Sequence, residues 1–231
     1  MRTINVHTLA AAALALLTVV GSASSQTPAS QILNALEVQK LASSNDPADN
    51  ARLSAHFAAL ADRYAAEAKR HTSMAQAFIG TPARRVAATS AADHCKRLAQ
   101  LNTESAKTLR ELAAYHQGLA GGKPAAAAPK GGTRFQSGAG APEPTDAQLA
   151  DLAAKANTPA DHHALEEYFQ NSVKRYTAAA NEHAAMAQAY RGTRIVQAAA
   201  HCDRLVTLSR DSVKEATAAA EMHKGLAGIA R

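Results

Sequence analysis

The stretch from residue 46 to residue 118 occurs twice in the sequence. Its aromatic, His and Met positions recur at one constant offset: Phe57, Tyr64, His71, Met74 and Phe78 return as Phe169, Tyr176, His183, Met186 and Tyr190. Further on, His94-Cys95 returns as His201-Cys202, and His116 returns as His223. A period of about a hundred residues indicates a duplicated domain-sized unit, because solenoid repeats are only about 20 to 50 residues long. The sequence therefore predicts two copies of one structural unit.

Residues 1–25 are typical of an export signal. Arg2 supplies a positive start, residues 9–20 form an apolar run, and small residues around Ala23 suit cleavage. The apolar run is shorter than the roughly 20 residues with which a helix spans a bilayer. No second apolar run follows. We therefore expect a mature chain without a membrane span, in the periplasm or secreted.

The two copies are separated by residues 121–144, which are rich in Pro, Gly and Ala and lack a periodic apolar pattern. Such a composition predicts a flexible linker and a boundary between structural units. We expect a signal peptide at 1–25, a first helical-hairpin repeat at 28–120, and a second repeat at 145–231. A short amphipathic segment leads into each repeat, and the second one opens on a capping box at Thr145.

Each copy is predicted to form a helical hairpin. Pro47 and Pro159 stand at first helical positions behind capping residues, and the apolar residues that follow keep a 3-4 spacing. The long helices are expected near 47–79, 84–120, 160–191 and 195–228. One hairpin cannot bury its apolar seam alone, whereas two hairpins can. The predicted fold class is therefore all-α: two duplicated αα-hairpins in an antiparallel four-helix bundle, with short leading helices.

The charge pattern and the missing motifs exclude several functions. The chain carries 25 Lys and Arg against 19 Asp and Glu, spread singly and without aromatic interleaving, so nucleic-acid binding is not expected. It has no nucleophile elbow, glycine-rich phosphate loop or paired-carboxylate cleft. Glu67, on the seam beside His71, is replaced by Ala179 in the second copy, which argues against a shared acid–base role. We expect no enzyme, and a homodimer or another envelope protein is left open as the partner.

The side chains kept in both copies are the candidate metal ligands. In a tight hairpin, His183 and His201 lie at the same height on facing helices, and the longer first turn does the same for His71 and His94. His, Met and Cys together form the ligand set that suits copper, with zinc also accommodated by His and Cys. The candidates are His71, Met74, His94, Cys95, His183, Met186, His201 and Cys202. Two alternatives stay open: packed core residues without a metal, and a b-type haem in the bundle.

The relative direction of the two hairpins decides which candidates meet. If both loops lie at one end, the two His/Met/Cys groups share a layer and Cys95 can approach Cys202. We favour this arrangement because consecutive antiparallel helices are common in bundles. If the hairpins run in opposite directions, His116 approaches the layer of the second loop and His223 that of the first. For the two cysteines, a disulfide, paired thiolate ligands and an intermolecular bridge all remain open.

The pattern H-x-x-M-A followed by H-C-x-x-L, in Ala-rich tandem hairpins, resembles exported bacterial tandem helical-hairpin proteins. The resemblance covers most of the mature chain and implies the fold, but it brings no established activity. The expected bundle shape is also similar to that of cytochrome b562-type proteins. Likeness of fold alone implies no function.

Overall fold

The computed structural model describes residues 32–79, 85–121, 144–193 and 195–229. These parts contain six helices and no strand, which confirms the predicted all-α class. The helices are α1 (Ala35–Ala42), α2 (Pro47–Ile79), α3 (Arg85–Leu119), α4 (Asp146–Lys155), α5 (Pro159–Arg191) and α6 (Val196–Ile229). The four long helices begin and end within one residue of the predicted positions. The expected signal peptide and nearly all of the expected linker lie outside the described residues.

Polar caps and one glycine fix the ends of these helices. Thr158 accepts a hydrogen bond from the backbone N–H of Asp161, whose carboxylate reaches back to the N–H of Thr158. This capping box satisfies N–H groups that the first turn of α5 leaves without an intrahelical partner. Just beyond α3, Gly121 has φ +68°, a left-handed conformation that glycine adopts without steric cost, and its N–H bonds to the carbonyl of Gly118.

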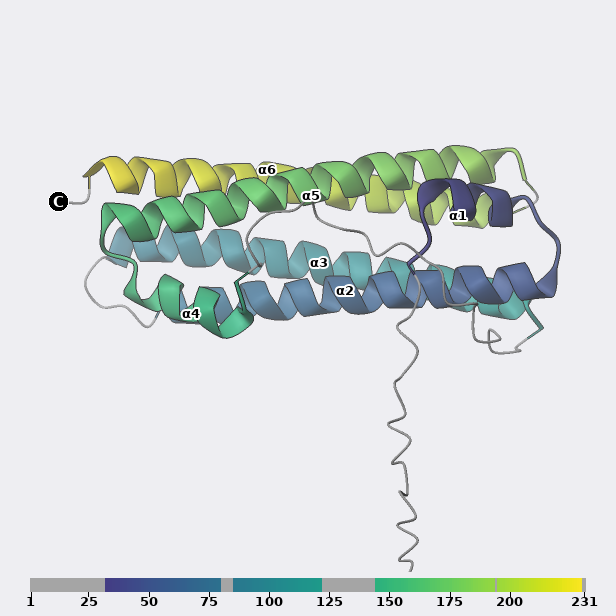
Figure 1. The fold of residues 1–231 in the computed structure, drawn as a ribbon, viewed down its shortest axis with the longest axis horizontal. Coiled ribbons are helices and arrows are strands. Elements are labelled where there is room, and N and C mark those ends of the chain that lie inside the picture. The colour runs from purple at the N-terminus through teal and green to yellow at the C-terminus, as the bar shows by residue number, and fades with distance from the viewer. Residues whose placement is uncertain (1–31, 80–84, 122–143, 194, 230–231) are drawn as a thin grey trace, which may run out of the picture.

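The two hairpins run in opposite directions along the bundle (Figure 1). Helix α2 packs against α3, α5 packs against α6, and α3 packs directly against α6. Helix α2 ends and α3 begins at one end of the bundle, whereas α5 ends and α6 begins at the other. The favoured prediction, with both loops at one end, is therefore wrong. The observed order makes α3 antiparallel to α6, so their helix dipoles oppose, and residues 122–143 are numerous enough to connect α3 back to α4.

The short leading helices are exchanged between the repeats. Helix α1 packs on α5 as well as on α2, whereas α4 packs mainly on α2. Figure 1 shows both short helices between α2 and α5, one toward each end of the bundle. The segment before α1 is anchored where the backbone N–H of Leu33 donates to Nδ1 of the buried His56, at 3.0 Å. Each repeat therefore covers part of the other, as the arms of a symmetric dimer do.

The core has a thin side and a thick side. Between α3 and α6 small side chains such as Ala106 and Ala216 are buried, which lets the two backbones approach closely. Between α2 and α5 the gap is filled by buried aromatic rings and imidazoles, including Tyr64 and Tyr176. Helices with a buried aromatic and polar stripe need exact partners for their polar atoms, and these partners define the candidate site. No helix in the described parts of the chain is long and apolar enough to cross a membrane.

Candidate functional site

One polar layer surrounds His71 in the middle of the bundle. His71 is fully buried, and its Nε2 lies 3.3 Å from the hydroxyl of Tyr176 on α5. Asn102 on α3 donates its side-chain amide to the same hydroxyl at 2.8 Å, so this hydroxyl is the donor to His71. Neutral His71 therefore carries its hydrogen on Nδ1, an atom without a hydrogen-bond partner. Burial, aided by the charges of Arg175 and Arg70, lowers the pKa of His71 to about 3.

The second copy provides the equivalent layer, in which the contact between His and Tyr is longer. Nε2 of His183 lies 3.5 Å from the hydroxyl of Tyr64, which makes the pair equivalent to His71 and Tyr176. Ser209 stands where the first copy has Asn102. Its buried hydroxyl has only a weak contact with the hydroxyl of Tyr64, and Nδ1 of His183 has no hydrogen-bond partner. Burial lowers the pKa of His183 to about 4.

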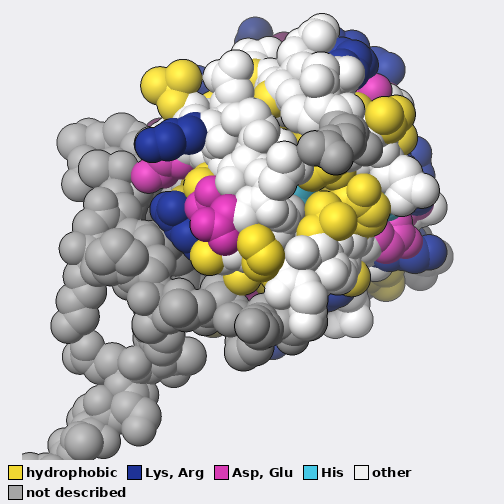
Figure 2. Space-filling model, turned by 90° about the vertical axis from the view of Figure 1, so that its right-hand side faces the viewer, with side chains coloured by type: hydrophobic (Ala, Val, Ile, Leu, Met, Phe, Trp, Pro, Cys, Tyr) yellow, Lys and Arg dark blue, Asp and Glu magenta, His cyan; other side chains and the backbone are white. Residues whose placement is uncertain are grey.

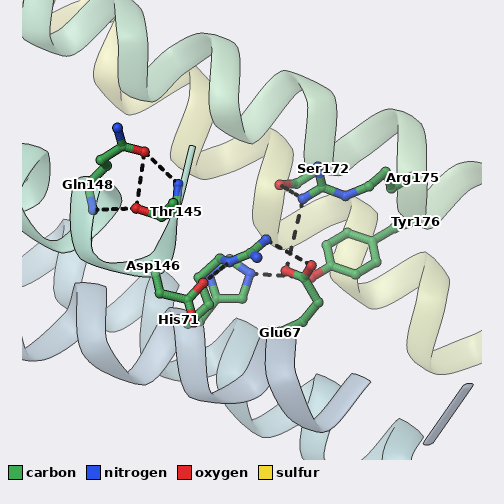
Figure 3. A network of polar contacts seen from close by, with 9 residues as sticks. Glu67, His71, Thr145, Asp146, Gln148, Ser172, Arg175 and Tyr176 are labelled. Atoms are coloured by element: carbon green, nitrogen blue, oxygen red, sulfur yellow. Dashed lines mark hydrogen bonds and ion pairs between the residues drawn. The ribbon is translucent and has the colours of Figure 1, made fainter. Parts of the chain in front are cut away.

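A half-buried ionic network joins α4 to the long helices beside this layer (Figure 3). Arg70 donates to Glu67 at 3.0 Å and to Asp146, the first residue of α4, at 2.7 Å. Arg175 on α5 donates to Ser172 at 3.0 Å and lies 4.0 Å from the second oxygen of Glu67. Glu67 thus links the two hairpins through Arg70 on α2 and Arg175 on α5. Sequence analysis missed this network because its members are spread over three helices without a common spacing.

Two equivalent histidine sites lie toward opposite ends of the bundle. We call the first the His116 site and the second the His223 site. The His116 site consists of Asn50, Phe57, His116 and Tyr190, and the His223 site consists of His162, Phe169, His223 and Phe78. Each site combines residues of both hairpins, because Tyr190 reaches the first repeat and Phe78 reaches the second. The placement of His116 and His223 follows the antiparallel alternative for the hairpins.

The two sites differ in what their central imidazole can bond. Nδ1 of His116 donates to the side-chain oxygen of Asn50 at 2.9 Å, and the Tyr190 hydroxyl donates to Nε2 at 2.9 Å. In the His223 site, Nδ1 of His223 lies 3.2 Å from Nδ1 of His162, and Nε2 has no hydrogen-bond partner. Burial lowers the pKa of His116 to about 4 and that of His223, with a smaller influence of His162, to about 3.

The eight candidate metal ligands do not come together. His71 and His183 bond to tyrosines, and Met74 and Met186 are buried in the apolar core. His94 and His201 are half-buried on the side formed by α3 and α6. There His94 contacts Glu215 at 2.6 Å, and His201 lies 3.7 Å from Glu111. In the described part of the chain, no three His, Cys, Asp or Glu side chains are close enough to hold a metal ion.

Both cysteines are free and buried. Because His94 faces Glu215 across α3 and α6, Cys95 is level with a position 13 residues from Cys202 (215 − 202). At 1.5 Å per residue, the two sulfurs are about 20 Å apart along the bundle, which excludes a disulfide within this chain. Burial raises the pKa of each thiol to about 12, so both cysteines are protonated at neutral pH.

The exposed apolar side chains are scattered over the outer surface. Figure 2 views the bundle from the end that carries the α5–α6 connection, and its hydrophobic side chains form separate small groups among charged and neutral ones. The large exposed apolar side chains are Leu36, Ile79, Leu119, Val196 and Ile229. Most lie at helix ends. Single exposed apolar residues of this kind are ordinary in soluble proteins.

Comparison of the chain with protein-family models, curated proteins and solved structures finds no match.

Proposed function

We propose that this chain is an exported, non-catalytic helical-bundle protein with a structural or interaction role. One observation carries the proposal: the histidines kept in both copies are engaged with each other's repeat inside the bundle. His71 bonds to Tyr176, His183 contacts Tyr64, and His116 bonds to Tyr190, so each contact joins one hairpin to the other. A duplicated residue that holds the two copies together is retained for assembly, without any need for a ligand.

Elemental analysis of the mature protein, together with paired substitutions, tests this proposal. We expect copper and zinc at background after dialysis, and we expect His71→Ala with His183→Ala to lower only the stability. The matched control is His94→Ala with His201→Ala, which alters half-buried residues and leaves the tyrosine contacts intact. Near-stoichiometric copper or zinc that either double substitution abolishes would refute the structural interpretation. A haem absorption spectrum would redirect the assignment to a b-type haem bundle.

Soft-metal binding is the second candidate, and one contact favours it. Nδ1 of His94 faces Oε1 of Glu215 at 2.6 Å, and Glu111 lies beside His201 in the other copy. A carboxylate behind a histidine is the usual way in which a protein orients a metal-binding ring, because it leaves Nε2 as the ligand atom. Copper or zinc at these two rings would need further ligands from a partner. Metal binding that is lost with His94→Ala and His201→Ala, but kept with His71→Ala and His183→Ala, is the result that this candidate requires.

Export is part of the proposal and has its own test. The amino-terminal pattern predicts cleavage near Ala23 or Ser25. Mass spectrometry of the chain recovered from a periplasmic extract or from the culture medium should find a mature amino terminus there. A full-length chain that stays in the cytoplasm would contradict the export proposal and leave the account of the bundle unaffected.

A further inference from the structure

The His116 site and the His223 site are built on nearly the same geometry. His116 stacks on Phe57 with ring centroids 5.6 Å apart, and His223 stacks on Phe169 at the same separation. The ring that approaches from the other hairpin, Tyr190 or Phe78, is centred 5.7 Å from the imidazole in both sites. The clearest difference between the two sites therefore lies in the atoms to which the central imidazole can bond.

The His116 site can accept one proton without a change of partners. On protonation His116 donates from both nitrogens. Asn50 already accepts from Nδ1, and the Tyr190 hydroxyl can rotate to accept from Nε2 instead of donating to it. Asn50 and Tyr190 do not themselves take up a proton as the pH falls, whereas His56, whose ring is centred 4.9 Å from that of Phe57, is a further titratable group beside this site.

The His223 site responds differently because its partner is a second imidazole. With both rings neutral, one Nδ1–H donates to the other Nδ1 across 3.2 Å. A first added proton leaves an N–H on Nε2 of His223, where Phe78 offers no acceptor lone pair. A second added proton places two Nδ1–H groups against each other. The contact then changes from a hydrogen bond to a repulsion between two cations.

We propose that the His162–His223 pair is an acid-sensitive latch, whose double protonation releases the end of α6 from the start of α5. The latch goes beyond the proposed structural role, because it makes one end of the bundle responsive to pH. Its opening exposes the apolar faces of Phe78 and Phe169, on which the His223 imidazole stacks in the closed state.

The charged groups around the latch are carried by the helices that meet there. On α5, the carboxylate of Asp161 accepts from the N–H groups of Asn157 and Thr158 and also attracts a protonated His162, and Glu166 contacts the exposed His163. On α3, His94 is the titratable group that affects the pKa of His223, and it is paired with Glu215. On α2 the contact is the uncharged ring of Phe78, and on α6 the flanking Glu221 and Lys224 are exposed.

Proton linkage makes the latch measurable. Opening frees two imidazoles in the His223 site, and each binds a proton below its ordinary pKa near 6.5. The equilibrium constant for opening the His223 end therefore rises by up to about a hundredfold for each unit by which the pH falls. Where opening frees only one imidazole, the rise is up to about tenfold. The experiment is amide hydrogen exchange of the full mature chain between pH 6.5 and the onset of global unfolding, corrected for the intrinsic exchange rate. The probes are the amides of 216–229, beyond Glu215.

The matched variants come from the chain itself. His162→Asn reproduces the Asn50 of the first copy. It should halve the slope of the logarithm of the opening constant against pH for the amides of 216–229, and leave that slope unchanged for the amides of 109–119. Asn50→His adds a second imidazole to the other end and should steepen the slope at 109–119. An unaltered slope at 216–229 in a folded His162→Asn variant overturns the latch. If that variant does not fold, an unaltered slope at 109–119 in Asn50→His overturns it.

Discussion

The His116 site and the His223 site show how little sequence separates a satisfied polar core from an unsatisfied one. Both hold an imidazole between two aromatic rings at matching distances. In the first, each ring nitrogen has a neutral partner, whereas in the second one nitrogen faces another imidazole and the other has no hydrogen-bond partner. Two replacements, Asn50 by His162 and Tyr190 by Phe78, produce the difference. The duplication keeps the packing and lets the hydrogen bonds change.

Acid challenges both sites at once and should have the largest effect. Burial lowers the pKa of His56, His116 and His183 to about 4, and that of His71 and His223 to about 3. These values lie below the 6.5 of an unfolded imidazole, so stability is complete above pH 6.5 and falls as the pH drops toward 4. At pH 5.5 the five rings together cost on the order of 7 kcal/mol, comparable to the whole stability of a small domain. Helical circular dichroism followed against pH should show unfolding in this window; a helix signal that persists to pH 4 would contradict it.

Replacing the two central imidazoles should separate the sites most clearly at neutral pH. His116→Leu leaves the oxygen of Asn50 and the hydroxyl of Tyr190 buried without partners, which should cost about 2 to 4 kcal/mol. His223→Leu sits between two phenyl rings and leaves only His162 with a changed partner, so we expect about 1 kcal/mol or less. Urea unfolding at pH 7.5 measures both. Equal losses in the two variants would mean that packing, and not hydrogen bonding, dominates these sites.

The fold was predictable from the sequence because several independent signals agree. The 3-4 spacing, the prolines at helix starts and the duplication all indicate paired long helices, and the helix ends fell within one residue of expectation. The direction of the hairpins was not predictable. Both arrangements bury the same seams, and residues 122–143 are numerous enough to permit either one.

The candidate site was predicted only in part, because the prediction rested on the residues that occur at matching positions in both copies. Matching positions identified His71 and His183 as candidate ligands and His116 and His223 as a recurring pair without an assigned role, and all four are buried. His162 was missed, since its counterpart is Asn50 and the pair does not match. Within a duplicated core, an unmatched polar residue beside a kept histidine indicates where the hydrogen bonding has diverged. That signal was present in the sequence.

The central layer allows the same comparison with a smaller effect. Asn102→Ala removes the amide that donates to the Tyr176 hydroxyl and should cost about 1 to 2 kcal/mol. Ser209→Ala removes a buried hydroxyl whose contact with Tyr64 is weak, so its effect should be within about 0.5 kcal/mol of zero. Thermal unfolding of the two variants at pH 7.5 gives the difference. A larger loss for Ser209→Ala would show that this hydroxyl bonds to Tyr64 in solution.

The most direct repair of the His223 site should have a small effect. Phe78→Tyr places a hydroxyl on a ring that already lies 5.7 Å from His223, the same centroid distance as between Tyr190 and His116. If the hydroxyl reaches Nε2, it satisfies a buried nitrogen and should stabilise the protein by about 0.5 to 1 kcal/mol at pH 7.5. The reciprocal control, Tyr190→Phe, removes the equivalent bond and should destabilise it by about 1 to 2 kcal/mol. Urea unfolding of both variants measures these opposite signs. Destabilisation by both changes would show that the two rings approach their imidazoles from different angles, so that equal centroid distances do not make the sites interchangeable.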